Sequence, residues 1–214
     1  MAVYKTSNSG LLTRTQYSSF LAGNEQFIPF APSGAYDSIA TATGTGSNTY
    51  VEFTSIPSTY THLQIRISGQ PNNPAGGGGT SVAMRINSDT GSNYNGHVLA
   101  GNGTNAVAGY FGVDTILPVA SIPQGGGASG GTQYMYNAAV IDILDYTNTN
   151  KYTTIRALSG WNKNNISLGT DIRLVGGLWL NTSAVNTIRL YANDGLNLSW
   201  YTGSTIALYG IKGN

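Results

Sequence analysis

Apolar and polar residues alternate with a period of two along most of this chain, and no other feature restricts its fold as much. Leu63–Ile67 and Val82–Ile86 show the pattern most clearly, with every second residue apolar. Such alternation is typical of half-buried β-strands. No segment carries the apolar stripe of an amphipathic helix. The pattern predicts further strands at Tyr36–Thr43, Thr49–Phe53, Gly96–Gly101, Val107–Val113, Gln133–Leu144, Tyr152–Ser159, Asp171–Val175, Leu178–Leu180, Asn186–Ala192 and Ser204–Lys212.

Clusters of Gly, Asn, Asp and Thr separate these segments and predict turns between them. They lie at residues 76–79, 89–91, 101–103, 125–131, 147–150 and 193–195. Short strands at this spacing predict an all-β fold, an antiparallel β-sandwich of the jelly-roll type. Gln133–Leu144 is apolar on both faces, which indicates either a central strand or a strand that meets a neighbouring subunit.

The first 35 residues differ from the rest because their apolar residues follow no sustained period. We therefore divide the chain into an N-terminal arm, residues 1–35, and a sandwich domain, residues 36–214. The arm either straps back onto the domain or anchors the protein to something else, and the sequence favours neither. Its candidate anchoring residues are Leu11, Leu12, Tyr17, Phe20, Leu21 and Phe27.

The composition excludes several classes of partner and chemistry. Charged residues make up 9% of the chain, against about 25% in a typical soluble domain. With a formal net charge of +1 and no basic run, nucleic acid is not an expected partner. The chain has no cysteine, so disulfides and thiolate chemistry are excluded. No apolar run approaches the length of a membrane span, and we expect no membrane insertion.

Arginine recurs between apolar residues in the predicted strands. The five examples are Arg66, Arg85, Arg156, Arg173 and Arg189. If the flanking residues face the core, each arginine projects from the opposite face. The five could form a stripe that recognises acidic glycans, or pair across strands with Glu52, Asp142, Asp145 or Asp171. The near-equal totals, 10 basic and 9 acidic residues, favour pairing.

Two motifs resemble functional motifs of enzymes but lack some of the residues that those motifs need. Asp89-Thr90-Gly91 has the letters of an aspartic-protease loop, but it occurs once, and that mechanism needs two carboxylates. These residues after an alternating strand are also typical of a hairpin turn. The glycine run at residues 76–79 is followed by Thr80-Ser81 and lacks the lysine of a phosphate-binding loop.

The titratable residues form no recognisable set either. His62 and His97 have no ligand-spaced partners, whereas a zinc site needs three or four ligands. Asp142 and Asp145 are three residues apart and so point to opposite faces of an extended strand, unlike the acid pair of a glycosidase, unless the strand ends between them. We predict no catalytic residue, no cofactor and no bound metal.

Aromatic residues in or beside predicted loops are the candidate ligand contacts. Rings stack on the apolar faces of sugars, while nearby amides and carboxylates bind the hydroxyl groups. The candidates for glycan contact are Tyr94, Tyr110, Trp161 and Trp200.

Several stretches of the chain resemble virion structural proteins of tailed bacteriophages that infect cyanobacteria and other marine bacteria. They are residues 4–12 (YKTSNSGLL), 19–24 (SFLAGN), 56–66 (IPSTYTHLQIR), 85–94 (RINSDTGSNY) with His97, 177–179 (GLW) and 203–213 (GSTIALYGIKG). The resemblance spans nearly the whole chain, and the residues that carry it are structural.

The resemblance implies a non-enzymatic particle component, a homotrimeric jelly-roll knob on a short arm. We expect a fibre- or spike-like appendage of the tail or neck, made in the bacterial cytoplasm, whose arm binds other virion proteins and whose domain contacts a host-surface glycan. The alternative is a decoration protein on the phage head, since about 35 residues before the domain leave no room for a long shaft.

Overall fold

The computed structural model describes residues 35–73, 78–124, 136–162 and 170–213, and the backbone of two short strands near the N-terminus. The chain divides into two compact units, Met1–Asp37 and Ser38–Asn214. In the first unit, β1 (Tyr4–Lys5) pairs antiparallel with β2 (Leu11–Leu12). The other predicted anchoring residues, Tyr17, Phe20, Leu21 and Phe27, lie outside the described residues.

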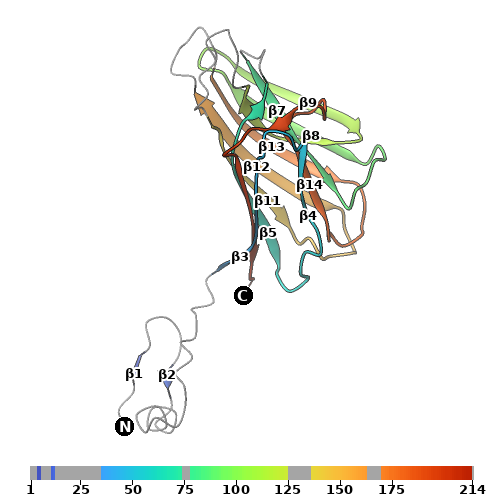
Figure 1. Ribbon diagram of the computed structural model, residues 1–214. Coiled ribbons are helices and arrows are strands. Elements are labelled where there is room, and N and C mark those ends of the chain that lie inside the picture. The colour runs from blue at the N-terminus through green and yellow to red at the C-terminus, as the bar shows by residue number, and fades with distance from the viewer. Residues whose placement is uncertain are drawn as a thin grey trace. The chain divides into compact units, whose positions relative to one another are not determined.

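The second unit is an antiparallel β-sandwich, which confirms the predicted fold class (Figure 1). Its larger sheet has eight strands in the order β3 (Tyr36–Thr43), β16 (Thr205–Ile211), β5 (His62–Ser68), β11 (Ala138–Leu144), β12 (Thr153–Asn162), β13 (Thr170–Trp179), β8 (Tyr94–Gly101) and β9 (Ala106–Asp114). Its smaller sheet has four, β10 (Leu117–Pro123), β7 (Gly79–Ile86), β14 (Ile188–Tyr191) and β4 (Tyr50–Phe53). A short pair, β15 (Ser199–Trp200) with β6 (Pro71–Asn72), completes the fold.

The chain passes repeatedly from one sheet to the other, as in jelly-roll sandwiches. β4, β7 and β10 of the smaller sheet are each followed directly by a strand of the larger one, and β14 is followed by one after the short strand β15. Figure 1 shows β11, β12 and β13 in one layer and β4 and β14 in the other. β11 lies between β5 and β12, so the segment predicted to be a central strand is one.

The core lies between the two sheets and follows from the alternation. In the larger sheet Ile141 stands in register between Ile65 and Ala157, and all three are buried. Met84 and Leu190 are paired in the smaller sheet and are also fully buried. Burial of such aliphatic side chains stabilises a domain by about 1.5–3 kcal/mol each.

The turn from β7 to β8 is tighter than the sequence indicates. Asn87 and Ser88 both have positive φ, at 51° and 54°, and the Asp89 backbone N–H donates to the Ile86 carbonyl at 2.9 Å. This geometry matches the type I′ turns of β-hairpins. Asp89 closes this turn, and Asp89-Thr90-Gly91 leads into the loop before β8, so its place between two strands is as predicted. β7 and β8 belong to different sheets, however, so the predicted hairpin does not form. The buried Tyr94 hydroxyl closes the loop, accepting from the Ile86 N–H at 2.9 Å.

β10 was not among the predicted strands. It contains Pro118 and Pro123, and proline cannot donate a hydrogen bond to a neighbouring strand. The strand forms because it is the edge of the smaller sheet, and its register with β7 shifts between Pro118 and Ala120. Edges and bulges are the places where a sheet tolerates proline.

β13 reverses the predicted faces. We expected Ile172 and Leu174 to face the core and Arg173 to face outward, but Ile172 is 59% exposed and Leu174 46% exposed. Alternation shows which residues share a face, not which face is buried. Val175 and Trp179 share the face of Arg173 and are buried, and they fix the orientation of the whole strand.

The other four arginines lie on the predicted faces, since the apolar residues that flank them are buried. Cross-strand pairing is confirmed for Arg156 with Asp142 at 2.9 Å and for Arg189 with Glu52 at 2.7 Å. Arg173 pairs with Asp171 of its own strand at 2.7 Å.

Replacing Tyr94 by Phe should lower the free energy of unfolding by about 1–3 kcal/mol, because the buried Ile86 N–H loses its partner. Burial raises the pKa of Tyr94 to about 12, whereas an unfolded tyrosine has a pKa of about 10. Its contribution to stability is therefore complete below pH 10 and falls as the pH rises toward 12. Urea unfolding followed by circular dichroism measures both effects.

Tyr110→Phe is the matched control, since this tyrosine is 61% exposed. Its effect should stay within about 0.5 kcal/mol. Equal losses in the two variants would contradict the role given to the Tyr94 hydroxyl.

Candidate functional site

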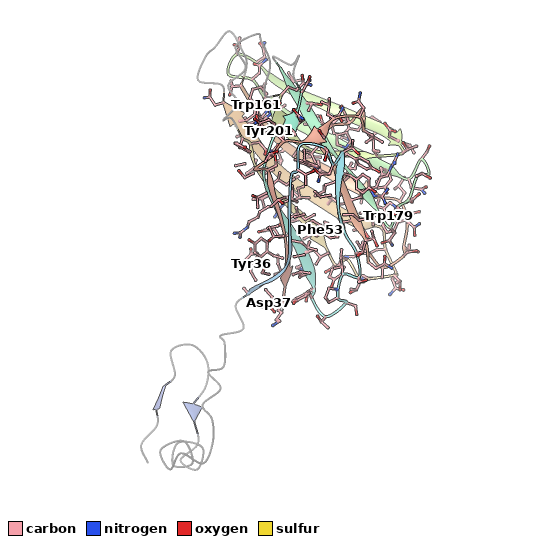
Figure 2. The ribbon with its side chains drawn as sticks, in the orientation of Figure 1. Tyr36, Asp37, Phe53, Trp161, Trp179 and Tyr201 are labelled. Carbon is pink, nitrogen blue, oxygen red and sulfur yellow. The ribbon has the colours of Figure 1, made fainter. Side chains whose placement is uncertain are left out.

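A pocket of about 440 Å³ opens at one end of the sandwich. Strands from both sheets line it with a mixture of small, apolar, hydroxyl, amide and charged residues: Gly78, Gly79, Val98, Ala100, Asn102, Val107, Trp161, Thr170, Asp171 and Arg173. Figure 2 shows Trp161 at this end and Trp179 well away from it.

The pocket wall is held by a chain of side-chain hydrogen bonds between the two sheets. The Trp161 indole N–H donates to Ser121 Oγ at 2.8 Å, and the Ser121 hydroxyl donates to Asp171 Oδ2 at 2.6 Å. The same carboxylate oxygen accepts from Arg173 Nε at 2.7 Å. Arg173 reaches back to Ser81 Oγ at 3.2 Å. These bonds explain why Arg173 is stable on the inner face of β13.

Buried polar residues behind this wall complete the network. The Ser121 backbone N–H donates to Ser159 Oγ at 2.9 Å, and its carbonyl accepts from Asn137 Nδ2 at 3.1 Å. Asn137 in turn accepts from the Gly69 N–H at 3.1 Å. Ser121, Ser159 and Asn137 are all buried. Satisfied networks of this kind hold a site rigid.

The chemistry of the pocket fits recognition of a polar ligand. Thr170, Asn102 and the Asp171–Arg173 pair offer hydroxyl, amide and charged groups beside the indole. The Trp161 residue is only 8% exposed, so it offers little surface for stacking. A ligand rich in hydroxyl groups can hydrogen-bond to such a wall without a charged group of its own.

The structure separates the four aromatic residues predicted to contact glycans. Trp161 lines the pocket, and Tyr110 is widely exposed on β9. Tyr94 and Trp200 are fully buried, so the expectation of a glycan contact there is corrected. Their polar atoms bind the backbone instead, and the Trp200 indole N–H donates to the Leu190 carbonyl at 3.2 Å. Large aromatics near turns often serve as core anchors.

Asp89 has a structural role at the opposite end of β13. Its carboxylate accepts from Trp179 Nε1 at 2.8 Å, from Asn93 Nδ2 at 2.9 Å and from the Gly91 N–H at 2.8 Å. Partial burial acts to raise the pKa of Asp89, but these hydrogen bonds outweigh it and hold the pKa below its ordinary value. The side chain ties the β7–β8 turn to β13.

Asp142 and Asp145 are also engaged by neighbouring residues. Asp142 accepts from Gln64 and Arg156, each at 2.9 Å. A hydrogen bond from Lys151 lowers the pKa of Asp145, outweighing a small effect of burial. The two carboxylates therefore hold parts of the chain together.

His62 contacts Asp145 through Nδ1. This nitrogen accepts a hydrogen bond from the Asp145 backbone N–H at 2.9 Å and lies 3.3 Å from Asp145 Oδ1.

The sequence patterns did not predict the polar wall of the pocket. Ser121, Ser159 and Asn137 belong to common residue types, and their partners lie far away in the chain. The only available signal was the pair of charged residues around Ile172, which the alternation assigned to the wrong face.

No protein-family model, curated protein or solved structure matches the chain. Among the described residues, no group of three histidine and carboxylate side chains is placed to hold a metal ion. The same part of the chain contains no helix with the length and apolar character needed to cross a bilayer.

A double-mutant cycle should distinguish the Asp171–Arg173 pair from an ordinary surface pair. Asp171→Ala leaves a partly buried guanidinium and the Ser121 hydroxyl without their partner. We expect it to lower the free energy of unfolding by about 2–3 kcal/mol. Adding Arg173→Ala to this variant should recover part of that loss. Denaturant unfolding of the four proteins gives the coupling energy.

The matched control is the cycle for Asp142 and Arg156 on the same sheet. The Arg156 side chain is 66% exposed, so this coupling should be about 0.5 kcal/mol or less. Similar coupling energies for the two pairs would contradict the structural role given to Asp171.

Acid should weaken the fold in part through Asp89. A carboxyl group whose pKa is lowered in the folded state contributes stability above its unfolded pKa of about 4, and that contribution is lost as the pH falls below this value. Asp89→Asn should lower the melting temperature at pH 7 and should flatten its decline between about pH 4 and pH 2.5. An unchanged decline in the variant would show that Asp89 is not one of the groups responsible.

Proposed function

We propose that this chain is a non-enzymatic structural protein of a bacteriophage particle. In this proposal it forms a short fibre- or spike-like appendage of the tail or neck, anchored by its N-terminal arm. Identical copies associate, and the sandwich domain contacts the host surface. The starting point is the resemblance of residues 56–66, 85–94, 177–179 and 203–213 to such proteins.

The segments that carry the resemblance contact one another in the fold. Residues 203–213 include β16, which pairs with β5 from residues 56–66, with Leu63 opposite Gly210. Asp89 of residues 85–94 accepts from Trp179 of residues 177–179. These contacts stabilise the sandwich, as expected of motifs shared among structural proteins of one fold.

One observation carries the non-enzymatic part of the proposal: carboxylates that could serve as acids or bases are used in structural contacts. Glu52, Asp89, Asp142, Asp145 and Asp171 each accept hydrogen bonds from side chains of the same chain. Catalytic acids and bases need access to a substrate. Asp171 lines the pocket, but its Oδ2 is already bound by Ser121 and Arg173. The contacts of the other four contribute to stability.

The pocket beside Trp161 supports the proposed host contact. It combines hydroxyl, amide and paired charged groups in a concave site near exposed loops. A neutral glycan is the ligand class that matches this mixture, because the charges of Asp171 and Arg173 already compensate each other.

The position of the protein on purified virions tests the proposal. Gold-labelled antibody against residues 36–214, viewed by electron microscopy, should mark the tail or neck. Label over the whole head would replace the appendage with a capsid-decoration protein. Particles without label would overturn both functions. Virions of the same phage treated with pre-immune antibody control for non-specific gold.

A further inference from the structure

Four apolar residues form a continuous row on the outer face of the eight-stranded sheet. Val140 stands opposite Leu158, Leu158 opposite Leu174, and Leu174 opposite Leu99, so the row crosses β11, β12, β13 and β8. Their exposed fractions are 38%, 54%, 46% and 55% in that order. Ile172, 59% exposed, adds to the row from the next position on this face of β13. We call these five residues the apolar face.

The orientation of β13 places two of the five residues on the apolar face. Ile172 and Leu174 point outward while their charged neighbours Asp171 and Arg173 lie on the inner side. A solvated sheet face is normally polar, with the apolar residues turned inward. The reversed arrangement is expected of a sheet that has a second surface to bury.

The apolar face is large enough for a specific protein interface. If a fully exposed residue of this size presents about 200 Å², the five residues together with Tyr110 expose roughly 650 Å². A standard interface buries about 800 Å² on each partner. Monomeric proteins rarely leave a contiguous apolar patch of this size uncovered.

Strand β9 extends this surface to the edge of the sheet. It is the last strand of the larger sheet in the described part of the chain, and eight of its nine residues are exposed. Its only charged residue is Asp114, at the very end. Long uncharged edge strands are normally protected from pairing with other chains. An assembly that covers β9 would supply that protection.

We propose that the apolar face, with the neighbouring strand β9, is the surface through which copies of this chain associate. The inference rests on one part of the proposed function, the association of identical copies. The charges around the surface suit an identical partner. Arg156 and Asp142 at its border are paired with each other. Arg66, opposite Val140, donates to Gln64 and lies over the Tyr209 ring. The net charge of +1 produces little repulsion between copies.

The first test is the mass of the full chain in solution, measured by light scattering after size-exclusion chromatography. We expect a dimer or trimer of the 22.4 kDa chain. Leu158→Glu should reduce the mass to that of the monomer, because it places an unpaired charge in the centre of the interface. Tyr152→Glu is the matched control: Tyr152 is 49% exposed just before β12, about 20 Å from Leu158 along the strand, and should leave the oligomer intact.

A second pair of variants covers the case in which Leu158→Glu fails to fold. The chain has no cysteine, so Leu158→Cys and Tyr152→Cys each introduce a unique thiol. We expect a bifunctional maleimide to cross-link Leu158→Cys between copies, and a monofunctional maleimide to react with it at least tenfold more slowly than with Tyr152→Cys.

Three results would overturn the inference. An oligomer that survives Leu158→Glu would place the interface elsewhere. A monomer whose Leu158→Cys thiol reacts slowly would mean that another segment of the same chain covers the face. A monomer with a rapidly reacting thiol would leave the face open to a different partner. Neither kind of monomer would affect the labelling of virions, so the proposed function is tested separately.

Discussion

The structure depends on one geometric constraint: a strand presents alternate residues to opposite faces of its sheet. In the part of the chain that the structure describes, the larger sheet has eight strands and the smaller sheet has four, so the smaller sheet can cover only part of one face of the larger. The residues on the other face must suit either water or another molecule. On β11, β12, β13 and β8 these residues are aliphatic, and this is the basis for treating the outer face as a surface that becomes buried.

The alternation was sufficient to predict most strands of the sandwich. Segments such as Tyr36–Thr43 match the observed bounds, because a strand with one buried face carries its pattern locally. β10 could not be predicted in the same way, since Pro118 and Pro123 are permitted only by its place at a sheet edge. Asp171–Val175 and Leu178–Leu180 were predicted as two strands and form one, β13, which continues through two glycines.

The candidate pocket was much less predictable. Asp171 was one of four carboxylates expected to pair with arginines across strands, but it pairs with Arg173 of its own strand. Both lie on the face opposite to the one predicted for Arg173, because Val175 and Trp179 decide the orientation of the strand. Ser121 and Asn137 hold the wall through partners brought together only by the fold. Trp161 was selected by residue type, as were Tyr94 and Trp200, and only the fold shows that Trp161 lines the pocket while the other two are fully buried. A local pattern does not contain that information.

The two surfaces support different parts of one interpretation. The pocket combines polar and apolar groups, its charges are paired with each other and it suits a neutral ligand, whereas the outer face is apolar, continuous and suited to an identical chain. They lie on opposite faces of the same sheet at β13, which supplies Asp171 and Arg173 to one and Ile172 and Leu174 to the other. The two surfaces meet at β9, because Val107 of that strand lines the pocket.

Amide hydrogen exchange of β9 and β13, followed by mass spectrometry as a function of protein concentration, tests the central claim most directly. Backbone groups on the open side of an edge strand exchange rapidly unless another chain covers them. We predict that peptides spanning Ala106–Asp114 become protected as the concentration rises through the range in which oligomers form, while the core strand β5 is protected throughout. Rapid exchange of β9 at every concentration, in a protein that nonetheless oligomerises, would contradict the account.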